Sequence, residues 1–247
     1  MKSSTDIGMN RTGTATSPRD AKEMAEAAMN ARVPPGDESE IAQVRSDYAS
    51  RGDRVGTMPP PTSVKGAVKT AGKMMKGQKP AVLLDKLGER LAFERTGSRL
   101  YEAIITKVMA QGGGSGAAPD IGLLRENQRQ EMEHMDLLVD ALVQMGADPT
   151  VQTPCADVAG VQSLGLIQVA TDPRTSISQC LNALLTAELV DTASWEMLVE
   201  LTEESGNDEL ANEFRRALAE EAVHLSRVRA WLTEATRAEA HGQGATA

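Results

Sequence analysis

Apolar side chains recur every three to four positions in four long segments of the chain, which is the period of an amphipathic helix. The segments cover roughly residues 81–110, 119–145, 175–204 and 208–238. Glycines follow the first three segments, at Gly112, Gly146 and Gly206, where helix ends are expected. Aromatic residues make up only 2% of the chain, and no run alternates as strands do. The pattern therefore predicts an all-α fold.

The lengths of the connections predict how these helices are arranged. Short turns join the first helix to the second and the third to the fourth, so each pair is expected to form an antiparallel hairpin. About 30 residues, 146–174, separate the two hairpins, which is too long for a tight turn. The sequence thus predicts a four-helix bundle with one long crossover between helices 2 and 3. Residues 161–170 are expected to form a short helix or strand within that crossover.

The N-terminal third has a different composition, with much Gly, Ser, Thr, Pro and charge and little that could form a core. We predict that residues 1–79 are a polar, mostly disordered tail, with one local helix over residues 20–32. Residues 64–79 combine five lysines with apolar positions. This basic segment could dock on a membrane surface or an acidic partner, or lie as a solvated arm on the chain's own acidic domain. The bundle is assigned to residues 80–238, and residues 239–247 to a disordered C-terminal tail.

Charge is unevenly distributed around a net value of −9. Residues 1–79 carry 13 Lys and Arg against 9 Asp and Glu, whereas residues 80–247 carry 13 against 26. An acidic core of this kind excludes nucleic acid as an expected partner and suits metal cations. The two cysteines, Cys155 and Cys180, form no metal or disulfide motif, and we expect reduced thiols in a cytoplasmic protein. No apolar run approaches the length of a transmembrane helix.

Acidic residues interrupt all four apolar stripes near their middles. Two stripes contain the motif Glu-x-x-His, at Glu131/His134 and at Glu221/His224, and together they use two of the three histidines. Residues i and i+3 lie on the same face of a helix, so each pair can present a carboxylate and an imidazole to one point. The other two stripes each contain a single glutamate, Glu94 or Glu188.

Buried carboxylates are costly unless they are paired or bound to metal. We find no Lys or Arg in the four stripes, so four inward carboxylates would be balanced by two divalent cations. Carboxylate and imidazole ligands suit iron or manganese, with zinc possible. Glu133 and Glu220, which stand beside these motifs, are expected on the solvated face.

The order of these residues along the chain resembles that of the ferritin-like superfamily of di-iron and di-manganese carboxylate proteins. The resemblance covers residues 80–238 and implies six metal ligands: Glu94, Glu131, His134, Glu188, Glu221 and His224. By the same resemblance, Glu131 and Glu221 bridge the two metals, each histidine binds one metal, and the other two glutamates are terminal ligands.

Two further residues are weaker candidates. Tyr101 stands seven residues after Glu94, and the resemblance implies that it donates an electron or a hydrogen bond; the alternative is a tyrosine of the core. Asp191 stands three residues after Glu188, where rubrerythrins carry an additional glutamate that can move onto the metal. A surface aspartate is the alternative there.

The resemblance implies a di-iron protein that reduces O₂ or peroxide or oxidises iron, with manganese as the alternative metal. The chain has no cysteine pairs of a rubredoxin domain, so a separate electron donor is expected. Hydroxylation of a small organic substrate, a manganese catalase and a non-enzymatic metal-binding bundle remain as alternatives. The protein is expected to be a homo-oligomer, most simply a dimer.

Overall fold

The computed structural model describes residues 18–31, 38–53, 55, 56, 58, 80–111 and 118–241. All regular structure within these ranges is helical, as the sequence predicts. The chain divides into two compact units, with the boundary between residues 54 and 55. The second unit contains the bundle and every residue of the candidate site.

The N-terminal unit contains two helices. Helix α1 (Pro18–Asn30) lies where the sequence predicts a local helix. Helix α2 (Ser39–Arg51) was not predicted. Its apolar residues Ile41, Val44 and Tyr48 recur at helical spacing, but none of its residues is buried. The basic segment at 64–79 lies outside the described residues.

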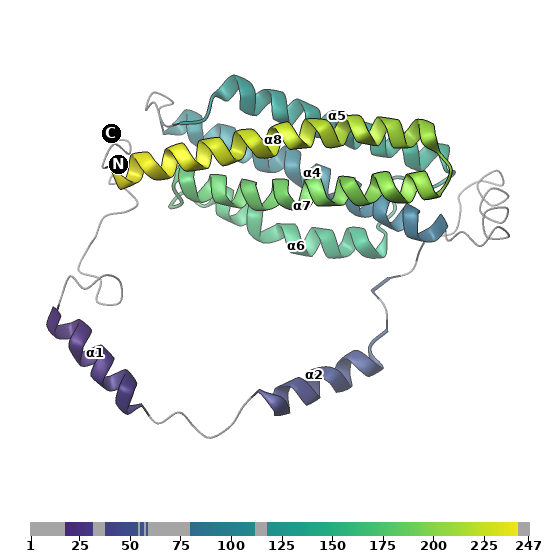
Figure 1. Cartoon of the computed structure of the whole chain (residues 1–247). Coiled ribbons are helices and arrows are strands. Elements are labelled where there is room, and N and C mark those ends of the chain that lie inside the picture. Colours follow the sequence, from purple (N-terminus) through teal and green to yellow (C-terminus); the bar gives the residue numbers. More distant parts are fainter. Residues whose placement is uncertain are drawn as a thin grey trace. The chain divides into compact units, whose positions relative to one another are not determined.

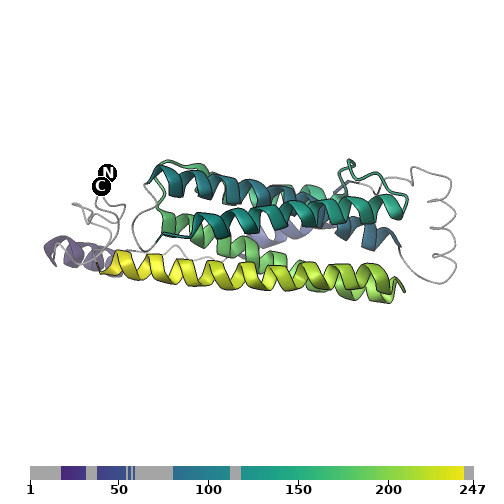
Figure 2. The ribbon, with the colours of Figure 1, turned by 90° about the horizontal axis from the view of Figure 1, so that it is seen from above.

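Four long helices form the bundle, and Figures 1 and 2 show them running side by side. They are α4 (Pro80–Ala110), α5 (Ile121–Gln144), α7 (Ile177–Glu204) and α8 (Asp208–Ala240). Helix α8 continues two residues past the predicted end of the bundle. The starts of these helices follow local chemistry: the Asp120 side chain caps α5, and Ser176 caps α7 in a capping box with Gln179.

The crossover between the hairpins contains a fifth long helix, α6 (Pro154–Thr171), which contacts α4 and α7. The sequence prediction placed only a short element at residues 161–170. The prediction missed the start of this helix, although the local sequence indicates it: the Thr153 side chain caps the helix and Pro154 occupies the first turn. Helix α6 starts close against α4: a Cβ atom added at Gly88 would lie 2.4 Å from the Thr153 hydroxyl oxygen.

The apolar core consists of two clusters, one at each end of the bundle. One cluster includes Leu100, Ile104, Leu124, Leu181 and Val228. The other includes Leu87, Leu138, Trp195, Leu198 and Phe214. On α5, α7 and α8 the two clusters are separated by the position of the predicted metal ligands, and on α4 they meet beside Glu94. A layer of charged side chains therefore crosses the middle of an otherwise apolar interior.

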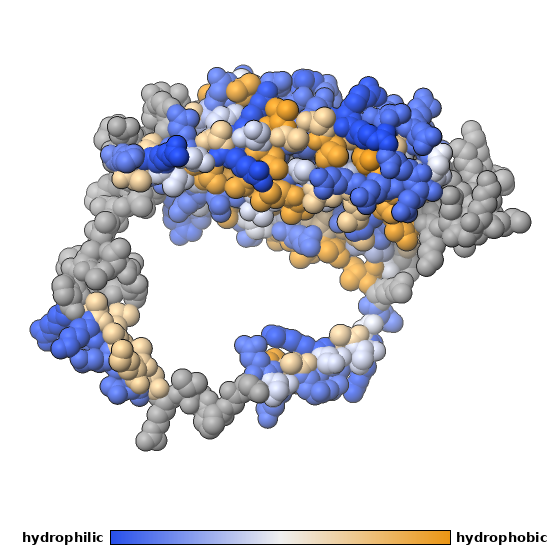
Figure 3. All heavy atoms as spheres, viewed as in Figure 1, coloured by the Kyte–Doolittle hydropathy of each residue, from blue (hydrophilic) through white to orange (hydrophobic). Residues whose placement is uncertain are grey.

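The face of the bundle seen in Figure 3 is mostly polar, with apolar atoms between the charged ones. Leu189, Val190 and Met197 on α7 and Val223 on α8 are exposed large apolar residues. Among the described residues, no helix has both the length and the apolar character needed to cross a membrane. The dimer expected from the sequence stays a prediction.

Candidate metal centre

The charged layer is built from side chains of the four long helices. All six residues expected as ligands lie there, and each exposes at most 3% of its surface: Glu94, Glu131, His134, Glu188, Glu221 and His224. Helices α4 and α7 each contribute one glutamate, and α5 and α8 each contribute a glutamate and a histidine from consecutive turns. The structure thus brings together residues that lie up to 130 positions apart in the sequence.

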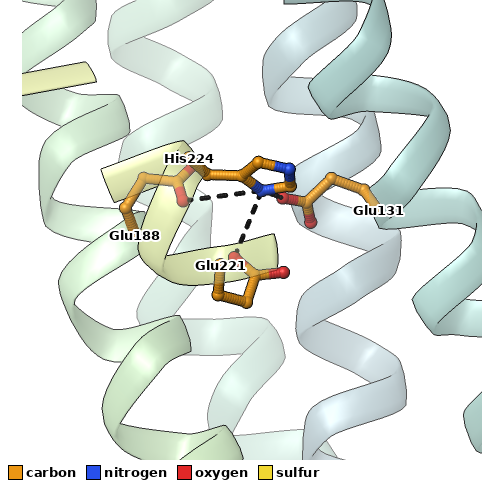
Figure 4. A group of neighbouring side chains, drawn as sticks. All are labelled: Glu131, Glu188, Glu221 and His224. Atoms are coloured by element: carbon orange, nitrogen blue, oxygen red, sulfur yellow. Dashed lines mark ion pairs between the residues drawn. The ribbon is translucent and has the colours of Figure 1, made fainter. Parts of the chain in front are cut away.

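One group of potential ligands surrounds His224, as Figure 4 shows. It comprises Glu131, Glu188, Glu221 and His224, whose ligand atoms all lie within 4.8 Å of one another. The Nδ1 atom of His224 lies 3.3 Å from Glu221, 3.4 Å from Glu131 and 3.9 Å from Glu188. These distances leave a small space bounded by one nitrogen and three carboxylates.

A second group surrounds His134 and includes Glu94 and Glu221. The Nδ1 atom of His134 lies 2.7 Å from Glu221 and 4.0 Å from Glu94. Glu221 therefore belongs to both groups. Glu131 lies near both as well, because a third group joins it to Glu94, Asp191 and Glu221. The carboxylates of the two Glu-x-x-His motifs are shared between the two groups, whereas Glu94 belongs to the His134 group and Glu188 to the His224 group.

The polar atoms that face this space have no hydrogen-bond partners. They include Nδ1 of both histidines, both carboxylate oxygens of Glu221 and the Oε2 atoms of the other three glutamates. Buried polar atoms are rarely left without partners in a native protein, and each such atom calls for an explanation. Two bound cations would satisfy these atoms together, so the residues fit a dinuclear metal site.

The outer nitrogen of each histidine is hydrogen-bonded to the opposite helix. Nε2 of His134 on α5 lies 2.8 Å from a carboxylate oxygen of Glu220 on α8. Nε2 of His224 on α8 lies 2.9 Å from the side-chain carbonyl oxygen of Gln130 on α5. Because an ionised carboxylate and a carbonyl only accept, each Nε2 must carry the proton. Nδ1 of each ring faces the centre and is the nitrogen that a metal ion would bind.

Tyr101 holds the terminal carboxylate of the His224 group. Its hydroxyl donates a hydrogen bond to Glu188 Oε1 at 2.5 Å and accepts one from the Asn127 side-chain amide at 3.0 Å. Arg227 donates in turn to the Asn127 carbonyl oxygen at 2.5 Å. Burial, followed by the charge of Glu188, raises the pKa of Tyr101 well above its usual value. The phenol therefore remains a hydrogen-bond donor at neutral pH.

The terminal carboxylate of the His134 group is held by one hydrogen bond and one ion pair, from two residues that the sequence prediction missed. The Trp195 indole N–H donates to Glu94 Oε1 at 2.9 Å, and Arg90 Nε lies 3.1 Å from the same oxygen. Arg90 Nη1 also lies 3.1 Å from Asp191. The expectation that no Lys or Arg enters the stripes is wrong, because Arg90 is only 2% exposed. Asp191 is equally buried, which rules out a surface aspartate.

Arg90 and Asp191 add one positive and one negative charge to the layer, so its net charge stays the same. With all groups ionised, the layer holds five carboxylates and one guanidinium, a net charge of −4. Two divalent cations neutralise it, as they would neutralise the four glutamates alone. The positive charge of Arg90 thus compensates the additional carboxylate of Asp191.

Ionisation in the layer is strongly perturbed. Burial, with the charge of Asp191, raises the pKa of Glu94 to about 7. Burial and the neighbouring carboxylates raise the pKa values of Glu131, Glu188 and Glu221 well above the usual value. Burial lowers the pKa of His224 to about 3, so its ring is neutral. Without cations, the layer therefore tends to hold protons on its carboxylates.

Gly97 provides the space that one shared carboxylate occupies. A Cβ atom added at this position would lie 2.3 Å from Oε2 of Glu131. Gly97 stands three residues after Glu94, at the offset at which Asp191 follows Glu188. Any side chain here would have to displace the Glu131 carboxylate.

Sequence reasoning missed several residues that contact the predicted ligands: Arg90, Asn127, Gln130, Trp195 and Glu220. A comparison of the two halves of the chain could have found Trp195 and the pair Gln130 and Glu220. Trp195 follows Glu188 by seven residues, as Tyr101 follows Glu94, and Gln130 and Glu220 each precede the glutamate of a Glu-x-x-His motif. Glu220, expected on the solvated face, has a side chain 42% exposed yet bonds His134.

A family model of the ferritin-like domain matches residues 122–238 of the chain. The match includes α6, α7 and nearly all of α5 and α8, with both Glu-x-x-His motifs. Helix α4, with Glu94 and Tyr101, lies outside the matched range and joins the site through its contacts alone. No match was found among the curated proteins or the solved structures.

Proposed function

Because the chain belongs to the ferritin-like superfamily, we propose that its bundle binds two iron ions and acts in the reduction of O₂ or peroxide or in the oxidation of iron(II). One observation carries this proposal. Both histidine Nδ1 atoms and at least one oxygen of each of the four glutamates converge in a buried space without hydrogen-bond partners. Manganese suits the same ligands, so the experiment below includes both metals.

The geometry supports a role for each residue in this proposal. Glu94 and His134 would bind one ion, and Glu188 and His224 would bind the other. Glu131 and Glu221, which lie near both histidine groups, would bridge the two ions. Such a pair of ions, when bound in its reduced state, would supply two electrons for the reduction of O₂ or peroxide.

The chain's other residues hold this arrangement in place. Tyr101, Trp195 and Arg90 bind the outer oxygens of the terminal glutamates and leave the inner oxygens for the ions. The Nε2 hydrogen bonds fix the orientation of both rings. The apolar clusters above and below the layer keep bulk water out, which strengthens electrostatic interactions inside it.

Two pockets of the bundle lie away from the charged layer. One pocket, about 180 Å³, lies between α4, the end of α5 and the start of α6, with Leu84, Leu91 and Leu142 in its lining. Another lies between α4 and α6 and is lined by residues such as Ala103 and Ile167. Neither of these two pockets is lined by a residue of the charged layer. A hydroxylase would need an apolar channel that reaches the metals.

The proposal includes a separate electron donor, or iron(II) itself as the reductant. Both cysteines of the chain are free, and neither contacts the layer: Cys155 begins α6 and Cys180 lies in the first turn of α7. The redox equivalents would therefore come from outside the chain.

The test measures metal content and oxidant consumption on the same samples. Protein is produced in cells supplemented with iron or with manganese, and bound metal is determined by elemental analysis. Two irons per chain with consumption of O₂ or H₂O₂ on reduction would support the proposal. Two manganese ions with O₂ release from peroxide would replace it with a catalase. Protein that binds no metal after anaerobic reconstitution would overturn it and leave a structural bundle. The Glu133→Gln variant, altered on the exposed face of α5, serves as a control and should behave like the unaltered protein.

A further inference from the structure

The outer hydrogen bonds of the two histidines differ in charge. His134 donates to the carboxylate of Glu220, whereas His224 donates to the neutral amide of Gln130. The two acceptors occupy the same place in the two motifs, one residue before the glutamate. The two contacts thus share their geometry and differ by a single unit of charge.

A carboxylate that accepts the outer N–H of a metal-binding histidine raises the electron density on the inner nitrogen. The ring then becomes a better ligand, and loss of such a partner typically lowers metal affinity about 10- to 100-fold. An amide oxygen orients the ring equally well but lacks the full negative charge. A charge-assisted hydrogen bond is also about twice as strong as a neutral one.

Given the dinuclear site of the proposed function, on which this inference rests, we propose that the two metal positions are unequal. The position at His134 binds its ion more tightly and fills first, because Glu220 strengthens its histidine. Glu220 and Gln130 act as positioning residues that rank the two positions.

The other charges near the layer leave this difference in place. Arg90 lies on the His134 side and pairs with both Glu94 and Asp191 at 3.1 Å, and the charge of Asp191 offsets its own. Arg227 lies on the His224 side and pairs with Glu126 at 3.3 Å. Each arginine thus has a carboxylate partner of its own. The inner oxygens of Glu94 and Glu188 are equally free on the two sides.

The partial exposure of Glu220 allows its charge to be removed by mutation, which tests the order of metal affinity at the two positions. Its side chain is 42% exposed, so Glu220→Gln keeps the shape and the hydrogen bond without leaving a buried charge behind. Gln130→Glu creates the opposite change at the matching position. Glu133→Gln, on an exposed side chain next to His134, removes one charge from the same region without touching either histidine.

The experiment is an anaerobic titration of metal-free protein with Co²⁺, followed by calorimetry and by proton NMR of the paramagnetically shifted histidine N–H signals. The unaltered protein should show two binding steps, with the His134 signal appearing at the first equivalent. Glu220→Gln should weaken the first step about 10- to 100-fold. The double variant Glu220→Gln/Gln130→Glu should make the His224 signal appear first, and Glu133→Gln should leave both constants unchanged.

Two results overturn the inference and are distinguishable from failure of the proposed function. Two bound Co²⁺ ions with constants that Glu220→Gln leaves unchanged would refute the ranking and keep the dinuclear site. A His224 signal that appears first in the unaltered protein would do the same. Protein that binds no Co²⁺ would overturn both the ranking and the proposed function.

Discussion

Tyr101 on α4 donates a hydrogen bond to Glu188, and Trp195 on α7 donates one to Glu94, so each hairpin holds the terminal carboxylate of the other. Both donors follow their own helix's glutamate by seven residues. The histidines repeat this exchange through Glu220 and Gln130. The two halves of the site therefore share one frame of reciprocal contacts, although their sequences differ.

The halves differ in the side chains that fill this frame. Three pairs of matching positions carry different residues: Arg90 against Leu184, Gly97 against Asp191, and Asn127 against Ala217. The first two pairs place an ion pair beside Glu94, and the third places an amide beside Tyr101. The comparison teaches that geometry and electrostatics vary separately here, since the frame is repeated while the charges around it are not.

The largest difference is expected between removing a carboxylate that belongs to both histidine groups and removing one that belongs to a single group. Glu221 belongs to both histidine groups, so Glu221→Gln should reduce the bound metal from two ions per chain to almost none. Glu188 belongs to one group, and Glu188→Gln should leave one ion. Elemental analysis with circular dichroism as a check of folding measures both. One ion retained in Glu221→Gln would show that the two groups do not share this ligand.

The ion pair found on one side only should matter most in the metal-free protein. Removing one partner of a buried ion pair leaves an uncompensated charge, so Arg90→Leu should lower the free energy of unfolding by about 3–5 kcal/mol at pH 8. Arg90→Leu/Asp191→Asn removes both charges and should recover part of that loss. Urea denaturation measures both variants. Equal stability of Arg90→Leu and the unaltered protein would mean that the ion pair contributes nothing.

Acid–base behaviour should also affect the stability of the metal-free protein. The pKa of Glu94 is raised from 4.5 in the unfolded chain to about 7 in the folded one, so the folded protein holds more protons between these values. Stability of the metal-free protein should then fall as pH rises from about 4.5 to 7, by about 3 kcal/mol from this group. The raised pKa values of the other glutamates extend the loss to higher pH.

Thermal denaturation across this pH range tests the expectation. The Glu94→Gln variant should show a smaller decrease, and metal-loaded protein should show the reverse dependence because cations replace the protons. A metal-free protein that becomes more stable between pH 5 and 7 would contradict the assigned direction.

The smallest expected effect concerns the donors to the terminal carboxylates. Tyr101→Phe removes the hydrogen bond to Glu188 while keeping the ring, and should weaken binding of the ion at His224 about tenfold. Binding at His134 should be unchanged. Stepwise Co²⁺ titration measures both constants. An equal loss at the two positions would show that the halves are coupled through their shared ligands.

Much of this arrangement was predictable because it is periodic. The positions of Glu94, Glu131, Glu188 and Glu221 within helical stripes gave both the four helices and the buried layer. The pattern failed where a residue is chosen by a partner on another helix. Arg90 interrupts an apolar face only because Asp191 lies opposite it on α7, and the sequence does not show which residues of two helices lie at the same level.

Helices α6 and α2 were also missed or only partly predicted from the apolar pattern. Helix α6 buries only small side chains, and α2 buries none, so neither presents a stripe of large apolar residues that pack into the core. Local chemistry marks the start of α6, at Thr153 and Pro154, but no stripe indicates its length.

Whether the six central residues bind metal stays a prediction until the ions are measured.

The charged layer between the two apolar clusters has a consequence for how the bundle opens. Ordinary helical bundles are expected to exchange their amide hydrogens first at fraying ends. Here the ends are the packed apolar regions, and without cations the middle is the part in which buried polar atoms lack hydrogen-bond partners. Amides near Glu131 and Glu221 should therefore exchange faster than those near Leu138 and Phe214 in metal-free protein. Bound cations would reverse that order and make the middle of the bundle its slowest part to open.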